Sequence, residues 1–311
     1  MRVYAMVTTR ASRDYTVAAL QSFFTHTPLD ASDLVCLIDN DGDWTEGLGL
    51  PPFPAGRCEV IRNHAPRSFA ANANQAMKIA SQRGADLFFL NDDLIFTPGW
   101  TAPFCGHPRT VLSPLSNREV QYRLKIEVSP GGACLSDFAL RSQMTLAEYL
   151  GHEARFAAIA EAHVATAAGI LPIFTLPFFC IRIPLAVINE VGAFDESFGV
   201  AGGEDFDYCL RAWLCGFEVA FTLSSYLLHF GGRASWAGGE SGDARRAREA
   251  GFVERFIAKW GEELQKLAFN FDFKVEDKGR GVAAALNNKD FGTVVRTLAG
   301  TPLPEARIPL T

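Results

Sequence analysis

The sequence lacks the glycine-rich loops by which many nucleotide-binding proteins hold phosphate. No GxGxxG follows the first predicted strand, which disfavours a dinucleotide-binding Rossmann site, and no GxxxxGK[ST] occurs in the 311 residues. A basic surplus is missing too, since the formal net charge is −6, so we expect no nucleic-acid partner. If such a chain binds a nucleotide, a divalent metal ion held by carboxylate and imidazole is the natural means of neutralising phosphate.

The seven cysteines include no CxxC pair, and their number is odd. Several lie in apolar runs, as Cys36 does within residues 34–38. This pattern is typical of buried reduced thiols and not of a disulfide framework or a zinc site. We therefore expect a reducing compartment and a cytoplasmic location.

Long hydrophobic runs are also scarce. The N-terminal MRVYAMVTTR is too short an apolar run for a signal peptide. Residues 164–188 are the one stretch long enough to span a membrane, but they contain three prolines and Arg182, so buried strands are the better interpretation. We expect no transmembrane span, and peripheral contact with the inner face of a membrane stays open.

The first hundred residues alternate between strand and helix patterns. Short apolar runs predict strands, and apolar residues at helical spacing predict the helices between them. Such a β-α-β order indicates a parallel sheet with helices on its faces. The strands are expected at 3–8, 34–38, 59–62 and 87–90, and the helices at 15–25 and 70–83.

The pattern is looser after residue 100. Alanine content predicts one helix and apolar stripes predict two more, the last of them long and amphipathic. The helices are expected at 145–168, 206–214 and 243–268, and strands at 174–183, 217–222 and 226–230.

Three polar clusters follow predicted strands: residues 8–10 (Thr-Thr-Arg), 39–42 (Asp-Asn-Asp-Gly) and 91–93 (Asn-Asp-Asp). Turn chemistry alone explains any one of them. The carboxyl ends of parallel strands meet at one edge of a sheet, where ligands bind. Three clusters at one edge therefore favour a binding site.

Asp93 and His229 are the candidate metal ligands. Asp93 follows one strand, and His229 ends another, just before Gly231 and Gly232. A lone histidine among apolar residues is more often a core residue than a ligand. The acidic site upstream and the glycines behind it shift the balance towards the ligand.

Glu204, Asp205 and Asp207 crowd three acids at one helix start, behind Gly202 and Gly203. Helix capping and the helix dipole explain one acid there, and Asp207 has a partner at i+4 in Arg211. Repulsion between the remaining carboxylates is tolerable mainly if one of them acts as a base, or if they bind a cation or an acceptor. The two glycines allow the backbone to approach a ligand closely.

Taken in order, these motifs resemble the family 2 inverting glycosyltransferases of the GT-A fold. The resemblance rests on the first strand with its two threonines, the LIDN and FAANANQA segments, FLNDD, and GEDFDYCLR with the CGFEV that follows it. It covers about the first three-quarters of the chain. It implies an α/β fold, a Rossmann-like mixed and mainly parallel sheet flanked by helices, with a C-terminal helical extension.

The resemblance also implies roles on the nucleotide side of the site. Asp39 would contact the base, and Asn91 and Asp92 would touch ribose or phosphate. The full set on this side is Thr8, Arg10, Asp39, Arg67, Asn74, Asn91 and Asp92.

For the chemistry, the resemblance implies Asp93 and His229 as ligands of Mn²⁺ or Mg²⁺. Asp205 would be the catalytic base, and Glu204 would orient the acceptor or the donor sugar. Asn91 stands where the family usually has its first acid, so the metal is expected to be retained while its affinity stays open.

The expected domain is residues 1–235, with a nucleotide-binding half at about 1–100 and an acceptor half at about 101–235. Residues 236–311 would form a flexible loop, with Trp236 closing over the donor, and the helical extension. The resemblance implies a nucleoside-diphosphate sugar as donor, with UDP or dTDP expected rather than GDP. It implies a glycan, glycolipid or protein as acceptor, in the synthesis of a surface glycan or polysaccharide. Formation of a homo-oligomer stays open.

Two other functions compete with this one. A nucleotidyltransferase could use a similar sheet, but residues 8–13 contain arginines and no glycine, unlike the glycine-rich basic loop of that class. A non-catalytic nucleotide- or carbohydrate-binding module is the third reading. The intact acids and histidine weigh against it.

Overall fold

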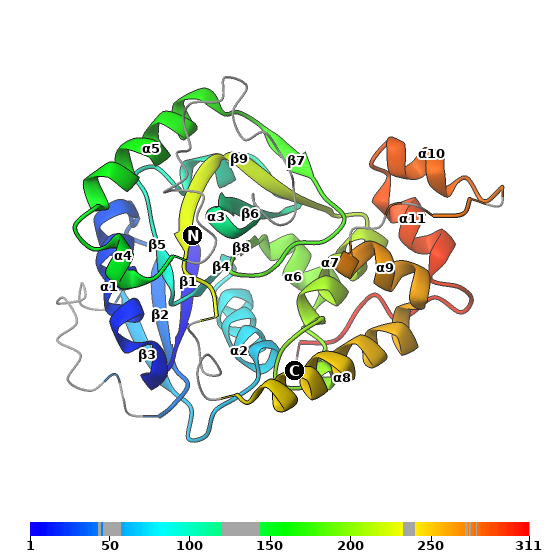
Figure 1. The fold of residues 1–311 in the computed structure, drawn as a ribbon, viewed down its shortest axis with the longest axis horizontal. Helices are drawn as coiled ribbons and strands as arrows, with labels where there is room; N and C mark the ends of the chain where they lie inside the picture. The colour runs from blue at the N-terminus through cyan, green and yellow to red at the C-terminus, as the bar shows by residue number, and fades with distance from the viewer. Residues whose placement is uncertain are drawn as a thin grey trace.

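A mixed sheet with helices on both faces forms the centre of the molecule (Figure 1). The computed structural model describes residues 1–42, 45, 57–119, 144–232, 240–270, 273, 275–277 and 279–310. In these residues the sheet has nine strands, in the order β3-β2-β1-β4-β8-β6-β9-β5, with β7 beside β9.

The N-terminal part of the sheet is parallel, as the alternating pattern predicted. β2 and β4 flank β1, and β3 pairs with β2, all in the same direction. The elements are β1 (Arg2–Thr8), α1 (Arg13–His26), β2 (Leu34–Asp39), β3 (Cys58–Arg62), α2 (Phe69–Gln82) and β4 (Asp86–Asn91).

The later strands extend this sheet with mixed directions. β8 is antiparallel to β4 and β6, β6 and β9 are parallel, and β5 and β7 both pair antiparallel with β9. The strands are β5 (Leu94–Ile95), β6 (Thr110–Ser116), β7 (Ile170–Pro172), β8 (Cys180–Ile183) and β9 (Glu218–His229). The helices after β4 are α3 (Asn117–Glu119), α4 (Leu146–Tyr149), α5 (Glu153–Thr166), α6 (Leu185–Val191), α7 (Glu204–Leu214), α8 (Gly242–Trp260), α9 (Glu262–Asn270), α10 (Val282–Asn287) and α11 (Phe291–Leu298), with short 3-10 turns at Arg10–Ser12, Ala102–Phe104 and Glu196–Phe198.

Two hydrophobic layers cover the sheet. Side chains of β1 alternate between them, so that Val3 lies in one layer and Tyr4 in the other. Phe23 of α1 belongs to the layer of Tyr4, and Met77 of α2 to the layer of Val3. The two helices therefore cover opposite faces.

Glycines divide two of the predicted helices. The helix expected at 243–268 is two helices, because Gly261 adopts φ +86 between α8 and α9. The helix expected at 145–168 is interrupted in the same way, with Gly151 at φ +83 between α4 and α5.

Two strand predictions need correction as well. Of the strand expected at 174–183, only β8 forms, at its end. The strands expected at 217–222 and 226–230 are one strand, β9, whose pairing with β6 shifts register between Pro114 and Leu115. Such an irregularity lets one strand continue through a break in its apolar pattern.

The helices α8 to α11 lie together beside α7, on one side of the molecule (Figure 1). Trp260, Leu264 and Val294 from these helices belong to the same hydrophobic layer as α7. The C-terminal extension is therefore packed on the rest of the chain.

Free thiols account for all the described cysteines, in agreement with the expectation from their spacing. Burial raises the pKa of Cys36 to about 12, so this thiol stays protonated and unreactive at neutral pH. In the part of the chain that the structure describes, no helix is long and apolar enough to cross a membrane.

Candidate active site

The predicted polar clusters meet at the carboxyl edge of the sheet. Thr8 at the end of β1 is the register partner of Asp39 at the end of β2. Asn91 at the end of β4 pairs with the residue before Thr8. Parallel pairing thus brings together three clusters that lie far apart in the sequence.

Asp93 and His229 come together at the same edge. Antiparallel pairing of β5 with β9 sets Leu94 opposite His229, and the amide of Phe230 donates to the carbonyl oxygen of Asp93 at 3.0 Å. The distance from His229 Nε2 to Asp93 Oδ1 is 3.4 Å. Both side chains are nearly buried.

Two contacts fix the imidazole of His229 in place. The ring stacks on Phe179, with centroids 4.8 Å apart. The backbone amide of His229 donates to Oδ1 of the buried Asn117 at 2.8 Å. The ring therefore faces Asp93 from a rigid strand end.

This pair fits a divalent cation. Two ligands about 2.1 Å from one ion, at angles of about 90–110°, lie about 3–3.4 Å apart, in agreement with the observed 3.4 Å. A carboxylate with one imidazole is a donor set for Mn²⁺ or Mg²⁺. Within the described residues no cluster of three or more His, Cys, Asp or Glu could hold a metal. Phosphate oxygens and water would therefore supply the remaining ligands.

Asp92, in contrast, has an internal role. It is 1% exposed and accepts hydrogen bonds from Thr16 Oγ1 at 2.9 Å and from Ser12 Oγ. Burial raises the pKa of Asp92 to about 7, and the charge of Asp93 adds to this effect, while the hydroxyl donors oppose it. The carboxylate anchors the start of α1, and its predicted contact with ribose or phosphate stays a prediction.

Asp39 shapes the turn that follows β2. It is fully buried, and Oδ1 accepts from the amide of Gly42 at 2.9 Å. Oδ2 accepts from the amide of Thr45 at 3.0 Å and from its hydroxyl at 2.7 Å. Its predicted contact with a base stays a prediction. The carboxylate of Asp41 accepts from the amide of Arg10, which holds that exposed residue at the same edge.

A network of asparagines positions Arg67, and of its members only Asn63 lies outside the quoted motifs. Asn63 Nδ2 donates to Oδ1 of Asn40 at 2.9 Å and to Oδ1 of Asn72 at 2.8 Å. Asn40 binds the backbone of Arg67 at both its amide and its carbonyl, at 2.9 and 3.1 Å. The backbone of Arg67 is therefore fixed beside the end of β2, and its guanidinium is exposed.

Asn74 is held by partners within the protein, and its predicted place on the nucleotide side stays a prediction. Its Oδ1 accepts from the amide of Phe194 at 2.7 Å, and its Nδ2 donates to the carbonyl of Phe194 and to Glu196 Oε1. The amide is thus used to tie α2 to the loop before α7. A half-buried polar residue on a helix gives no sequence signal that separates these two roles.

The acidic helix α7 begins at the same edge. The chain runs away from this edge along α7 and returns along β9, which packs on α7 and ends at His229. The amide of Phe69, the first residue of α2, donates to the carbonyl of Val200 at 3.0 Å. The loop before Glu204 therefore lies beside the segment of Arg67.

Glu204 and Asp205 differ in environment. Glu204 is 4% exposed, and its Oε2 accepts from the amide of Gly202 at 2.5 Å. Burial and the charge of Asp205 raise the pKa of Glu204 to about 8, against the opposing effects of backbone hydrogen bonds and of Arg248. Asp205 is half-buried, with Oδ1 accepting from the amide of Phe206 at 2.8 Å. At neutral pH Glu204 is therefore protonated, whereas Asp205 is the carboxyl group open to solvent.

The raised pKa of Glu204 predicts a pH-dependent stability difference. Unfolded, this carboxyl group loses its proton near pH 4.3, whereas the folded protein keeps it up to about pH 8. Folding takes up a proton in this window, so the free energy of unfolding falls as pH rises through it. The Glu204→Gln variant has no such carboxyl group, so its free energy of unfolding does not fall for this reason. We expect the stability of the variant relative to wild type to rise from pH 5 to pH 8 in thermal unfolding. A pH-independent difference would contradict the assignment.

Asp207 is structural, as its spacing to Arg211 predicted. The distance from Arg211 Nε to Asp207 Oδ2 is 2.8 Å, and neither side chain is exposed. Asp207 Oδ1 accepts from Trp260 Nε1 at 2.8 Å and lies 2.8 Å from Lys259 Nζ. Asp207 therefore joins α7 to α8.

One face of α8 holds the loop before the acidic helix. Arg248 donates to the carbonyl of Ala201 at 3.2 Å, and Arg255 to that of Phe198 at 2.9 Å. Gly202 adopts φ +119, and a Cβ there would lie 2.3 Å from the ring of Phe252. The glycine thus allows close packing on α8, and the predicted close approach to a ligand stays a prediction. Phe256 and Trp260 of this helix are buried in the core.

Comparison with solved structures identifies the fold. The chain aligns with a structure of GalNAc-T7 with UDP, GalNAc and Mn²⁺ at a TM-score of 0.56 and 16% identity, over 95% of this chain and 54% of that one. The chain has the GT-A fold. It spans about half the length of the GalNAc-T7 chain.

Two further GT-A neighbours are more distant. A mannosyltransferase from Pyrobaculum calidifontis, PcManGT, in complex with GDP-Man and Mn²⁺, aligns at a TM-score of 0.47 and 10% identity, over 96% of this chain and 84% of that one. TarS of S. aureus (residues 1–349) in complex with UDP-GlcNAc aligns at 0.47 and 12%, over 96% and 90%. No family model and no curated protein matches the sequence.

Arg118, which the motifs did not indicate, lies beside the candidate metal pair. It follows Asn117 at the end of β6, and a Cβ on Gly231 would lie 2.4 Å from its guanidinium. Gly231 adopts φ +67 two residues after His229. The guanidinium therefore lies against the strand end that carries the candidate metal ligand. The predicted lid residue Trp236 lies outside the described residues.

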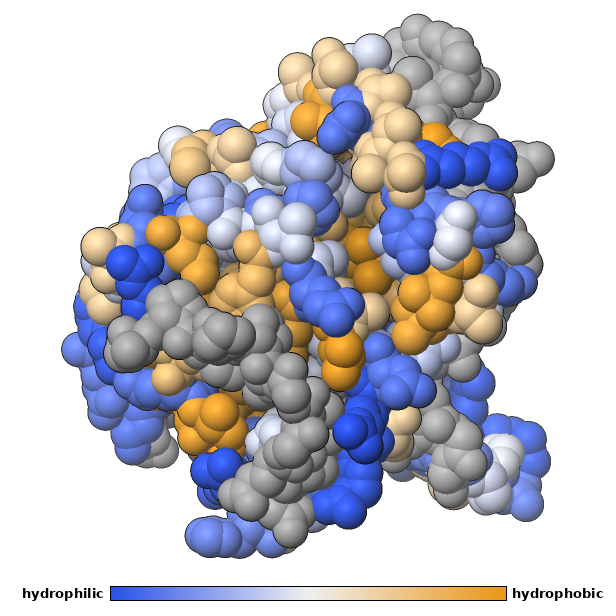
Figure 2. Space-filling model, turned by 90° about the vertical axis from the view of Figure 1, so that its left-hand side faces the viewer, coloured by the Kyte–Doolittle hydropathy of each residue, from blue (hydrophilic) through white to orange (hydrophobic). Residues whose placement is uncertain are grey.

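The molecular surface also shows a hollow on one side. Figure 2 shows hydrophobic side chains in the middle of this face, bordered by hydrophilic residues. Large hydrophobic side chains that are exposed by about half in the described residues are few and scattered, such as Leu150 and Val200. Isolated exposures of this kind are normal for a protein surface.

Proposed function

We propose that this chain is a metal-dependent inverting glycosyltransferase that moves a sugar from a nucleoside-diphosphate sugar to an acceptor hydroxyl. The observation that carries the proposal is the pair of Asp93 Oδ1 and His229 Nε2, 3.4 Å apart. The pair lies at the carboxyl edge of a GT-A sheet, where the acidic helix also begins. The fold alone does not assign an activity, so the proposal rests on the residues of the site.

Asp205 is the proposed general base. Its half-buried carboxylate takes the proton of the acceptor hydroxyl while that oxygen forms a bond to the anomeric carbon. The bond from this carbon to the diphosphate oxygen breaks in the same step, so the configuration inverts. A bound metal ion would neutralise the charge of the departing diphosphate.

The neighbouring residues support this step. Glu204, protonated at neutral pH, can donate a hydrogen bond that orients the sugar or the acceptor. Asp93 and His229 would hold the metal, while Arg10, Arg67 and Asn91 would contact the nucleotide or its phosphates. The rigid Asn40 network and the turn of Asp39 fix this side of the site before the ligand arrives.

The proposed halves of the domain, the donor and the acceptor follow from a site at this edge of the sheet. Residues 1–100 are the proposed nucleotide-binding half, residues 101–235 the acceptor half, and residues 236–311 the extension. UDP or dTDP is the favoured nucleotide, and a glycan, glycolipid or protein in surface glycan or polysaccharide synthesis is the acceptor. The reaction would take place in the cytoplasm, where nucleotide sugars and reduced thiols coexist.

Calorimetry tests the proposal. We expect one of UDP, dTDP and GDP to bind, and the omission of Mn²⁺ to weaken this binding at least about tenfold, because a metal ion held by Asp93 and His229 would neutralise the charge of the diphosphate. Asp93→Asn should remove most of the effect of Mn²⁺, whereas Asp195→Asn, a carboxylate paired with Lys259, should not.

Two outcomes would contradict it. Failure of all three nucleotides to bind would favour a carbohydrate-binding module. Tight binding of a nucleoside triphosphate, with release of pyrophosphate when a sugar phosphate is added, would indicate a nucleotidyltransferase.

A further inference from the structure

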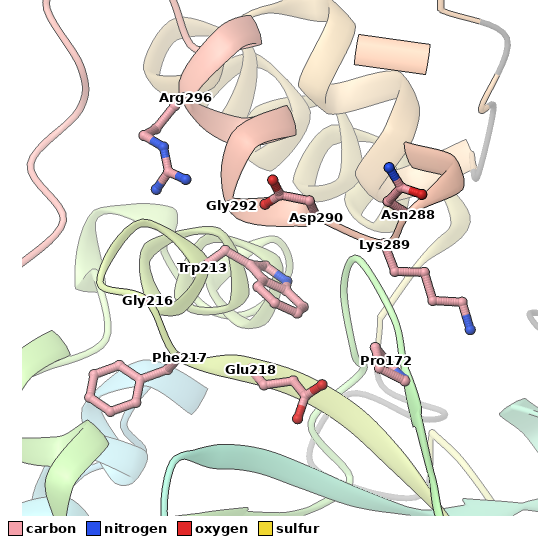
Figure 3. Close-up of a pocket in the computed structure, with 10 residues that line it drawn as sticks. All are labelled: Pro172, Trp213, Gly216, Phe217, Glu218, Asn288, Lys289, Asp290, Gly292 and Arg296. Carbon is pink, nitrogen blue, oxygen red and sulfur yellow. The ribbon is translucent and has the colours of Figure 1, made fainter. Parts of the chain in front are cut away.

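A cavity lies at the opposite edge of the sheet from the candidate active site. It has a volume of about 420 Å³, within the range of small-ligand sites. Its walls come from the turn between α7 and β9 and from the turn between α10 and α11 (Figure 3). Glu218 in its wall is the first residue of β9, and His229 is the last. The cavity is therefore separate from the site of transfer.

Lys289 in this cavity has an unusual backbone. It adopts φ 56, the one positive φ of a non-glycine residue in the described chain. Its amide donates to the carbonyl of Leu286, and the amide of Asp290 donates to that of Ala285. These bonds form a Schellman motif, in which the position of Lys289 is normally glycine. A lysine is costlier there than glycine, so its side chain calls for a role that offsets the strain.

The polar groups around the cavity are only partly used by the protein. No hydrogen bond or ion pair joins the side chain of Lys289 or Asn288 to another described residue. Glu218 accepts from Thr110 through Oε2, and Asp290 caps α11 by accepting from the amide of Thr293 through Oδ1. Their second oxygens have no partner in the described residues. Donors and acceptors are therefore both available.

Trp213 provides an aromatic wall. Its Nε1 donates to the carbonyl of Phe174 at 3.0 Å, and its ring packs edge to face on Phe291. The indole is therefore fixed in orientation. Figure 3 shows it between Asp290 on one side and Glu218 on the other, with Lys289 and Arg296 at opposite ends.

The charges of this cavity select the class of ligand. Lys289 and Arg296 offset Glu218 and Asp290, so there is no net positive charge to favour an anion. A neutral ligand with many hydroxyl groups can accept from the lysine and the amide, donate to the carboxylates, and lie against the indole. We propose that this cavity is a second, non-catalytic binding site for a neutral glycan. The proposal does not depend on the activity proposed above.

Binding of neutral disaccharides to the full chain tests this site. Chitobiose, maltose and lactose would each be titrated at millimolar concentrations, with inorganic phosphate as the anionic probe. We expect at least one disaccharide to bind, and Lys289→Gly to weaken it about tenfold, because a hydrogen bond from a charged donor is lost. Lys289→Gly should not lower the midpoint of thermal unfolding, because glycine suits this backbone. Lys78→Ala removes a lysine from the surface of α2 and should leave binding unchanged.

Four results would overturn the proposal. The first is that none of the disaccharides binds. The second is that Lys289→Gly leaves binding unaffected, and the third is that Asp205→Asn abolishes it; either would place the sugar elsewhere. The fourth is that phosphate alone binds in a manner that depends on Lys289, which would make the cavity an anion site.

Discussion

Replacing Asp205 by asparagine is expected to lower the turnover number about 10³-fold, the usual contribution of a positioned general base. The acceptor hydroxyl would then keep its proton as its oxygen attacks the anomeric carbon. Nucleotide binding should stay within about twofold of wild type, because Asp93 and His229 are unchanged. The rate of nucleoside diphosphate release from the donor selected by calorimetry, with and without acceptor, measures the loss.

The control keeps the same chemical change away from the reaction. Asp195→Asn alters a carboxylate on the loop before α7, whose partner is Lys259 at 2.7 Å. It should retain most of the activity. Near-normal turnover in Asp205→Asn, or an equal loss in both variants, would remove Asp205 from the role of base.

Replacing Asp207 by alanine is expected to destabilise the fold by about 3–5 kcal/mol, since it leaves a buried guanidinium without its carboxylate. Arg211 has no exposed surface and would keep only the carbonyl oxygens of Val191 and Ala193 as acceptors. Trp260 Nε1 would also lose its acceptor, so α8 would be held less firmly on α7. Urea unfolding of the purified variant measures the loss.

Asp195 again provides the comparison. It shares Lys259 with Asp207, but its side chain is 20% exposed, and such pairs contribute about 0–1 kcal/mol. A loss below about 1 kcal/mol in Asp207→Ala would mean that the buried pair does not hold α7 and α8 together.

The strand-end rule predicted the carboxyl edge of this site well. Apolar runs placed β1, β2 and β4, and parallel pairing then required Thr8, Asp39 and Asn91 to meet. The Asp207 pair was also predictable, because residues four apart on a helix are neighbours.

Long-range side-chain contacts could not be predicted in this way. Asp92 is buried against α1 and Asn74 against the loop of Phe194, although both belong to motifs that suggested ligand contacts. The face of α8 that binds residues 195–203 was visible only as an amphipathic stripe. Its partners depend on tertiary packing, which a local pattern does not encode.

A metal ion between Asp93 and His229 is the centre of the proposed site, and a crystal structure with Mn²⁺ and the selected nucleoside diphosphate tests it most directly. We predict one anomalous manganese peak within about 2.3 Å of both a carboxylate oxygen of Asp93 and Nε2 of His229, with diphosphate oxygens as further ligands. A bound nucleotide without such a peak, or a peak that touches neither residue, would contradict the proposed site.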